Sequence, residues 1–343
     1  MIVNYTKILI SIILPVYNSE LTILRCLNSF CKQLTITDEL IIIDDGSTDR
    51  SSNIILDYLK NNNKNIFFIQ KSNGGVSSAR NLGILKSRGK FITFIDSDDY
   101  VSENYLDTIR LNLNSELIIF DSFNNFPSNK QLFKKFSGVN LSLNSKNSIL
   151  LNQLLSFNII NPIWNKIYSK SVISKYNILF DTSLRNGEDL VFNLNYILRI
   201  NQFIIINQKI YYYDNTLPNS LSKQRSESLF FNQLSLSKQV IHFFSSINVD
   251  LTSNTGVFLL NNLLYSLLFL FPIPNDTNRI NTLKNFKINF EDHHFLVLLK
   301  KYYLYSFFSI LVYLSKKIFG ITFVFNFYSI FAKFYHKRKS RRL

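Results

Sequence analysis

Two pairs of acidic residues have the spacing that metal binding and proton transfer require. Asp96 and Asp98 lie two positions apart in the string DSDD, directly after the apolar run 91–95. Carboxylate oxygens suit Mg²⁺ or Mn²⁺, and such a cation neutralises the charge of a departing diphosphate. The same string also suits a solvated turn that caps the following helix, so the pair alone leaves both interpretations open.

Glu188 and Asp189 form the second pair, between Gly187 and the apolar helical stretch 190–198. A carboxylate in this position can act as a general base toward an attacking hydroxyl. Acidic residues also stabilise the first turn of a helix through its dipole, which is the structural alternative.

Asp45 belongs to the string DDGSTD at 44–49, in which Gly46 permits a tight turn. A carboxylate at this point can accept the imide N–H of uracil and so confer base specificity. The string also fits ordinary turn chemistry with a helix cap from Ser47 or Asp49, and both interpretations can hold together.

Arg80 lies in the string NGGVSSARN at 73–81, after two adjacent glycines that allow close approach of the backbone. Its guanidinium can reach a phosphate or a base, although a loop with a surface arginine would look the same. The glycine spacing matches neither the dinucleotide fingerprint nor the P-loop.

An alternation of strands and helices positions these strings. Apolar, β-branched runs predict strands at 8–16, 39–45, 65–70 and 90–96, with helical spacing between them. This alternation predicts an α/β fold with a mostly parallel sheet and helices on both faces. Each polar string follows a strand, and the carboxyl ends of parallel strands meet at one edge, where ligands bind. A further strand is expected at 203–214.

The chain of 343 residues carries a formal net charge of +15, with the excess at the C-terminus. Lysines flank three apolar, aromatic segments at 255–274, 302–314 and 318–335. This placement favours a membrane surface over nucleic acid, which would need a basic stripe across a folded domain. A globular helical subdomain and a true membrane span remain as alternatives. The two cysteines, Cys26 and Cys31, cannot form a disulfide framework and fit a reducing cytosol.

The strings SIILPVYN, LIIIDDGSTD, NGGVSSARNLG and GKFITFIDSDDY together resemble the family 2 glycosyltransferases of the GT-A fold. WNKIYSK and NGEDLVFNL resemble the bacterial capsule and lipopolysaccharide branch of that family. The resemblance covers about 8–225. It implies a Rossmann-like GT-A fold, an inverting mechanism, a nucleotide-sugar donor that is often UDP-linked, and a DxD site for Mn²⁺ or Mg²⁺.

The resemblance also implies roles for individual residues. Asp189 would be the base, with Glu188 as its alternative, and Asp98 would bind the metal, with Asp99 as its alternative. Asp96 would contact ribose or the metal. The nucleotide-sugar would be held by Pro15, Tyr17, Asn18, Asp45, Arg80, Asp96 and Ser97.

These considerations predict a GT-A domain at 1–225 and a helical, apolar C-terminal region at 226–343 that associates with a membrane. The expected activity is transfer from a UDP-sugar to a saccharide or lipid-linked saccharide in cell-surface polysaccharide synthesis, without nucleic acid. The expected location is the cytoplasmic face of the cell membrane. A QxxRW motif does not follow Asp189, which favours single-sugar transfer. The alternative functions are nucleotide-sugar binding without transfer and nucleotidyl transfer.

Overall fold

The computed structural model describes residues 7–62, 65–123, 137, 140–142, 159–214, 236 and 239. The chain divides into two compact units, Met1–Asn147 with Phe157–Ser220, and Ser148–Ser156 with Leu221–Leu343. The predicted boundary at 225 and the three apolar C-terminal segments lie outside the described residues. Among the residues that are described, no helix is both long and apolar enough to cross a membrane.

Four parallel strands form the first half of the sheet and confirm the predicted strands. They are β1 (Ile10–Val16), β2 (Asp38–Asp44), β3 (Ile66–Gln70) and β4 (Phe91–Phe94). Every residue of β1, β2 and β4 is buried, as continuous apolar runs in a covered parallel sheet require. β1 pairs with both β2 and β4, and β2 pairs with β3.

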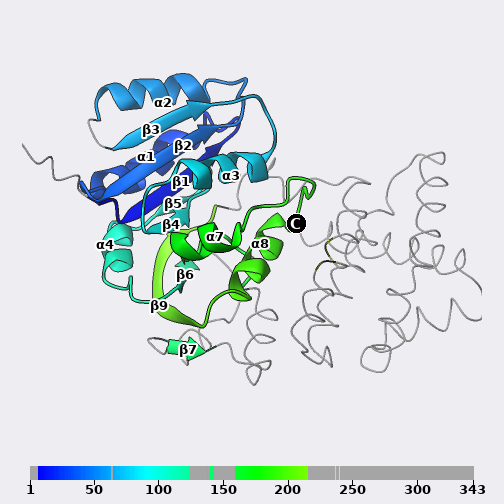
Figure 1. Cartoon of the computed structure of the whole chain (residues 1–343). Coiled ribbons are helices and arrows are strands. Elements are labelled where there is room, and N and C mark those ends of the chain that lie inside the picture. Colours follow the sequence, from blue (N-terminus) through cyan, green and yellow to red (C-terminus); the bar gives the residue numbers. More distant parts are fainter. Residues whose placement is uncertain are drawn as a thin grey trace, which may run out of the picture. The chain divides into compact units, whose positions relative to one another are not determined.

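The second half of the sheet is mixed, a feature that the sequence alternation does not predict. It contains β5 (Tyr100–Val101), β6 (Leu117–Phe123), β7 (Asn140–Ser142), β8 (Lys166–Ser169) and β9 (Gln202–Tyr212). β8 runs antiparallel between β4 and β6, and β9 lies beside β6. The strand order is β3-β2-β1-β4-β8-β6-β9-β5, with β7 paired to β9 (Figure 1).

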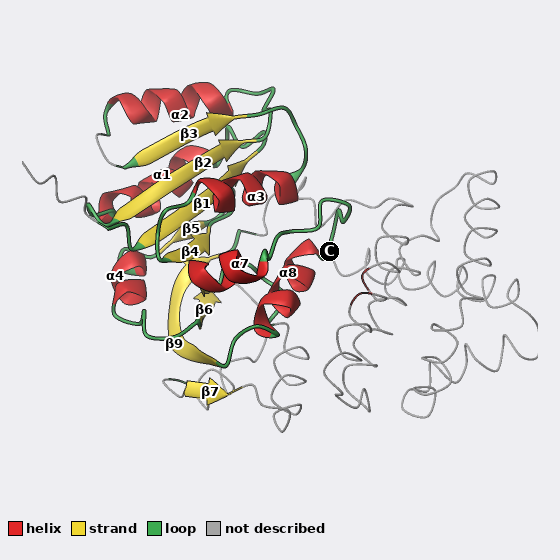
Figure 2. Cartoon of the chain, in the orientation of Figure 1, coloured by secondary structure: helices red, strands yellow, loops and turns green. Residues whose placement is uncertain are grey.

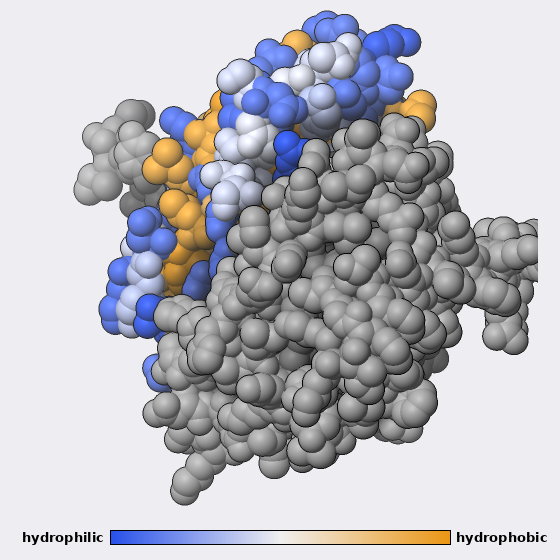
Figure 3. All heavy atoms as spheres, turned by 90° about the vertical axis from the view of Figure 1, so that its right-hand side faces the viewer, coloured by the Kyte–Doolittle hydropathy of each residue, from blue (hydrophilic) through white to orange (hydrophobic). Residues whose placement is uncertain are grey.

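Helices cover both faces of the parallel half, as predicted: α3 packs on β1 and β2 in front of the sheet, and α1 lies behind it (Figure 2). The first helices along the chain are α1 (Ile23–Phe30), α2 (Ser51–Lys60), α3 (Val76–Lys86) and α4 (Tyr105–Arg110), with a short 3₁₀ turn, η1 (Cys31–Gln33). The later helices are α7 (Lys170–Tyr176) and α8 (Glu188–Ile197). In the view of Figure 3, the described surface is mainly hydrophilic, with some hydrophobic side chains exposed among the polar ones.

Candidate active site

The loops that carry the polar strings are tied to one another at the carboxyl ends of the parallel strands. The backbone N–H of Asp45 donates to the carbonyl of Val16 over 2.8 Å, which joins the ends of β1 and β2. The N–H of Lys71 donates to the carbonyl of Asp44 over 3.0 Å, which joins β2 to β3. The motifs therefore meet at one edge of the sheet, as the order of elements predicts.

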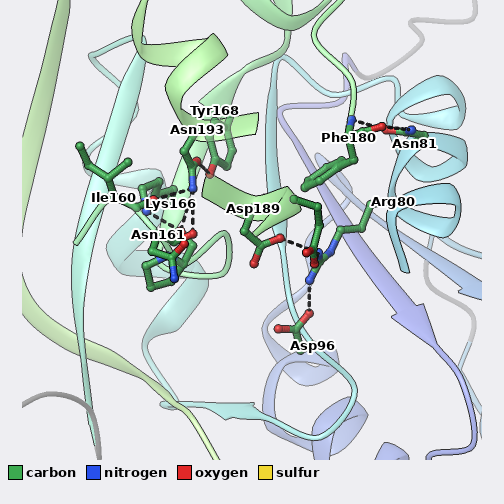
Figure 4. A network of polar contacts seen from close by, with 12 residues as sticks. Arg80, Asn81, Asp96, Ile160, Asn161, Lys166, Tyr168, Phe180, Asp189 and Asn193 are labelled. Atoms are coloured by element: carbon green, nitrogen blue, oxygen red, sulfur yellow. Dashed lines mark hydrogen bonds and ion pairs between the residues drawn. The ribbon is translucent and has the colours of Figure 1, made fainter. Parts of the chain in front are cut away.

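Arg80, in α3, connects the two acidic pairs (Figure 4). One terminal nitrogen of its guanidinium lies 2.9 Å from an oxygen of Asp96. The other lies 2.6 Å from Asp189 and 3.4 Å from Glu188. Three carboxylates thus surround one cation, and residues separated by more than 100 positions form a single network.

Burial and charge both act on this guanidinium. Arg80 is 3% exposed, and burial alone would lower its pKa, but Asp189, Asp96 and Glu188 raise the pKa above its usual value. Its carbon lies 5.3 Å from the ring centre of Phe180. The arginine is therefore a fixed, permanently charged link between the acidic pairs.

Asp189 has the electrostatic setting of a general base. Desolvation is the largest cause that raises the pKa of its carboxyl to about 8, Arg80 lowers it, and the Glu188 and Asp96 charges raise it further. A pKa near the working pH is the most effective one for proton transfer. Glu188 and Asp189 lie in the first turn of α8, after Gly187 with φ +89°, so the helix dipole also favours them.

Asp99 holds the DSDD loop in place. Its two carboxylate oxygens accept hydrogen bonds from the hydroxyl of Tyr211 over 2.7 Å and from the N–H of Asp214 over 2.8 Å. The Tyr211 oxygen also accepts a bond of 3.2 Å from the N–H of Asp96. Sequence reasoning missed Tyr211, because nothing in the run YYYD distinguishes an inward-facing tyrosine from its neighbours.

Asp98 and Asp96 are partly exposed carboxylates of this loop, whereas Asp99 is buried. Desolvation, followed by the charge of Asp96, raises the pKa of Asp98 to about 6. Arg25 donates to the backbone carbonyl of Asp98 over 2.6 Å and to the carboxylate of Asp214 over 2.7 Å. Arg25 and Asp214 are further residues of this region that sequence reasoning did not single out.

The Asp45 carboxylate is held by the loop that follows β3. One oxygen accepts from the N–H of Gly74 over 3.0 Å and pairs with the ammonium of Lys71, and the other accepts from the N–H of Gly75 over 2.7 Å. Gly75 has φ +86°, a conformation that favours glycine. Asp45 is 3% exposed, so it organises the NGG loop in addition to any contact with a base.

The remaining candidates lie around the β1–α1 connection. Pro15 is buried within β1, whereas Tyr17 is 50% exposed and free to stack on a ligand. The Asn18 side chain accepts from the N–H of Thr48 over 2.8 Å. The hydroxyls of Ser97 and Ser19 lie 2.7 Å apart, which joins the DSDD loop to this connection.

Comparison with known proteins supplies the family. Residues 11–176 match the model of the family described as Glycosyl transferase family 2. This part of the chain is a family 2 glycosyltransferase domain. The chain is 32% identical over 219 residues to the uncharacterized glycosyltransferase EpsJ of Bacillus subtilis, which covers 63% of each chain. It is 29% identical over 210 residues to the poly(ribitol-phosphate) beta-N-acetylglucosaminyltransferase TarS of Staphylococcus aureus, over 59% of this chain and 35% of TarS.

Solved structures agree on the fold of the glycosyltransferase domain. The crystal structure of residues 1–349 of S. aureus TarS in complex with UDP has a TM-score of 0.61 and 20% identity, over 96% of this chain and 92% of that one. The complex of the same protein with UDP-GlcNAc has a TM-score of 0.59. This likeness confirms the GT-A fold predicted from the sequence. The sequence matches cover less than two thirds of EpsJ and TarS.

Proposed function

We propose that the chain transfers a sugar from a UDP-sugar to a hydroxyl of an acceptor, with inversion at the anomeric carbon. The observation that carries this proposal is the contact of Arg80 with both Asp96 and Asp189. It ties the motif expected to hold the donor to the motif expected to activate the acceptor. The family match supports the class of reaction.

Asp189 takes the proton of the acceptor hydroxyl as that oxygen attacks the anomeric carbon. The bond from this carbon to the UDP oxygen breaks in the same displacement, so UDP leaves with the bonding electrons. Glu188 lies beside Asp189, and Arg80 orients both carboxylates. A single displacement at carbon inverts its configuration.

The acidic loop fits a divalent cation. Desolvation and the nearby negative charge of Asp96 together raise the pKa of Asp98 to about 6. A bound cation would stabilise both carboxylates in this site. Among the described residues, no three Asp, Glu, His or Cys side chains form a metal site by themselves. Mg²⁺ commonly binds one or two carboxylates and completes its coordination with phosphate oxygens and water. Mn²⁺ or Mg²⁺ held by Asp98 and Asp96 would supply neutralisation of the diphosphate charge.

The donor is proposed to bind at the edge formed by the loops after β1, β2 and β4. Tyr17 offers an exposed aromatic face for the uracil ring, and Asn18 and Asp45 lie in the adjoining loops. A UDP-linked donor is supported by TarS, which shares the fold and whose crystals contain UDP and UDP-GlcNAc.

The acceptor is proposed to be a saccharide or a lipid-linked saccharide, used in the synthesis of a cell-surface polysaccharide. The support comes from the basic, aromatic composition of 300–343, which suits the cytoplasmic face of an anionic membrane. Removal of 318–343 is expected to weaken binding to anionic liposomes, measured by flotation, while UDP binding stays unchanged. A truncated protein that floats with liposomes as the full chain does would contradict the membrane part of the proposal.

A panel of UDP-sugars, assayed by release of UDP with Mn²⁺ and with EDTA, tests the proposal. We expect release from at least one sugar, stimulated by added saccharide and abolished by EDTA. Release that produces UMP and sugar phosphate, or none from any UDP-sugar, would contradict glycosyl transfer. The alternative of binding without turnover predicts tight UDP binding together with no release.

A further inference from the structure

Two buried polar side chains hold the segment from Ile159 to Asn165, which precedes β8. The ammonium of Lys166 donates to the carbonyl of Ile159 over 2.8 Å, to the carbonyl of Pro162 and to the side-chain oxygen of Asn165 over 2.7 Å. The side-chain amide of Asn193 donates to the carbonyls of Ile160 over 2.6 Å, Asn161 over 3.1 Å and Pro162 over 3.2 Å. Four consecutive backbone carbonyls are therefore bound by two side chains.

The orientation of the Asn193 amide is fixed by a third residue. Tyr168, two positions after Lys166 in β8, donates its hydroxyl to the side-chain oxygen of Asn193 over 2.6 Å. The amide nitrogen must then face the segment, because its oxygen is engaged. Figure 4 shows this group beside Asp189.

Two observations place the segment next to the proposed base. Asp189 and Asn193 are one turn apart on α8, so their side chains project from the same face of the helix. Burial is the largest cause that lowers the pKa of Lys166, and the charge of Asp189 acts against it, which requires the two groups to be near each other. The segment is thus anchored to the same face that presents the base.

Within 159–169, Asn161 and Pro162 are the residues that are partly exposed, and the others are buried. In the described part of the chain, the Asn161 side-chain amide makes no hydrogen bond to a protein group. An amide that carries two donors and an acceptor is therefore held at the surface, in the segment anchored to α8, and remains available to a ligand.

We infer that Asn161 and Pro162 form part of the acceptor subsite, and that the Asn161 amide binds a hydroxyl of the acceptor saccharide. Lys166 and Asn193 are positioning residues, which act through the backbone that they hold. This inference rests on the proposed function, because it requires Asp189 to face the acceptor. It gives the buried Lys166, whose charge desolvation disfavours, a role in holding the subsite.

Three variants separate a binding role from a purely structural one. Asn161→Ala removes the exposed amide without touching the anchors. Asn193→Asp keeps the shape but replaces the donor nitrogen with an oxygen that repels the carbonyls. Gln33→Glu is the matched control, because the Gln33 amide likewise donates to backbone carbonyls, those of Ser29 and Ser102, over 2.8 Å each.

The measurements use the full chain, Mn²⁺, the UDP-sugar with the fastest UDP release, and octyl hexosides as acceptor probes. We expect Asn161→Ala to raise the acceptor KM about tenfold, the effect of one lost hydrogen bond to a ligand, with kcat reduced less. Asn193→Asp should raise the same KM by at least as much. UDP affinity should stay at the parent level in both variants.

Gln33→Glu should lower Tm as Asn193→Asp does but leave the acceptor KM unchanged. An unchanged acceptor KM in Asn161→Ala, or a loss of UDP affinity instead, would overturn the inference while leaving glycosyl transfer intact. A parent protein that releases UDP from no UDP-sugar would overturn the proposed function, and the inference with it.

Discussion

The guanidinium of Arg80 lies 2.6 Å from the carboxylate of Asp189, although the two residues are 109 positions apart. The same guanidinium lies 2.9 Å from Asp96. One arginine of α3 therefore links the loop after β4 with the first turn of α8. The position of the proposed base depends on this contact, and its ionisation depends on its burial and on the surrounding charges.

Replacing Arg80 with Met should destabilise the protein as well as inactivate it. Removing one partner of a buried ion pair lowers the free energy of unfolding by about 3 to 5 kcal/mol. We expect about 3 kcal/mol here, because the three carboxylates keep some contact with water. Urea denaturation followed by circular dichroism measures this loss. Lys60→Met, which breaks an exposed pair with Asp57, is the control and should leave the midpoint unchanged. Equal midpoints for both variants would show that the Arg80 network contributes nothing to folding.

Asp98→Asn should remove most of the transferase activity and weaken the binding of UDP in the presence of Mn²⁺. A neutral amide is a poor ligand for a hard cation, so the advantage that the metal gives to UDP binding should disappear. Isothermal titration of UDP with and without Mn²⁺ measures this advantage. If the parent protein binds UDP equally well in both conditions, the metal assignment of Asp98 fails.

The pH profile should report the ionisation of Asp189. The base must be unprotonated to accept a proton, and the pKa of Asp189 is raised to about 8, so activity is lost as the pH falls below that value. Transfer rates measured at saturating donor should rise about tenfold per pH unit below pH 7 and level off above pH 8. A rate that is constant from pH 6 to pH 8 would exclude Asp189 as a base with this pKa.

Stereochemistry tests the single displacement. An α-linked UDP-sugar should give a β-linked product, because one attack by the acceptor oxygen inverts the anomeric carbon. The H1–H2 coupling constant of the product in the NMR spectrum distinguishes the two configurations for a gluco-configured sugar. An α-linked product from an α-linked donor would require a second displacement and would contradict the mechanism.

The first half of the fold could be predicted because its signals are local. β1, β2 and β4 contain continuous apolar runs followed by polar strings, and the alternation of such runs with helical spacing predicts a parallel sheet. The antiparallel insertion of β8 between β4 and β6 could not be predicted, because the hydrophobic pattern of a strand does not show which distant strand it pairs with.

The same distinction separates the predicted site residues from those that were missed. Asp96, Asp98 and Asp189 stand in recognisable strings, but which carboxylates Arg80 contacts depends on packing across the sheet. Nothing in the sequence distinguishes Lys166 from an ordinary surface lysine, yet its side chain is fully buried. Its burial follows from three acceptors that only the folded segment supplies.

The comparison of Asp189→Asn with Glu188→Gln tests the central claim most directly. Both variants remove one carboxylate from the same helical turn and from the same arginine, so their effects on packing are matched. The measurement is kcat for transfer from the selected UDP-sugar, with UDP affinity determined on the same samples by titration. We predict that Asp189→Asn lowers kcat by roughly 10² to 10⁴ with UDP affinity nearly unchanged, and that Glu188→Gln has a much smaller effect. The reverse order, with Glu188→Gln nearly inactive and Asp189→Asn close to the parent, would contradict the assignment of Asp189 as the base.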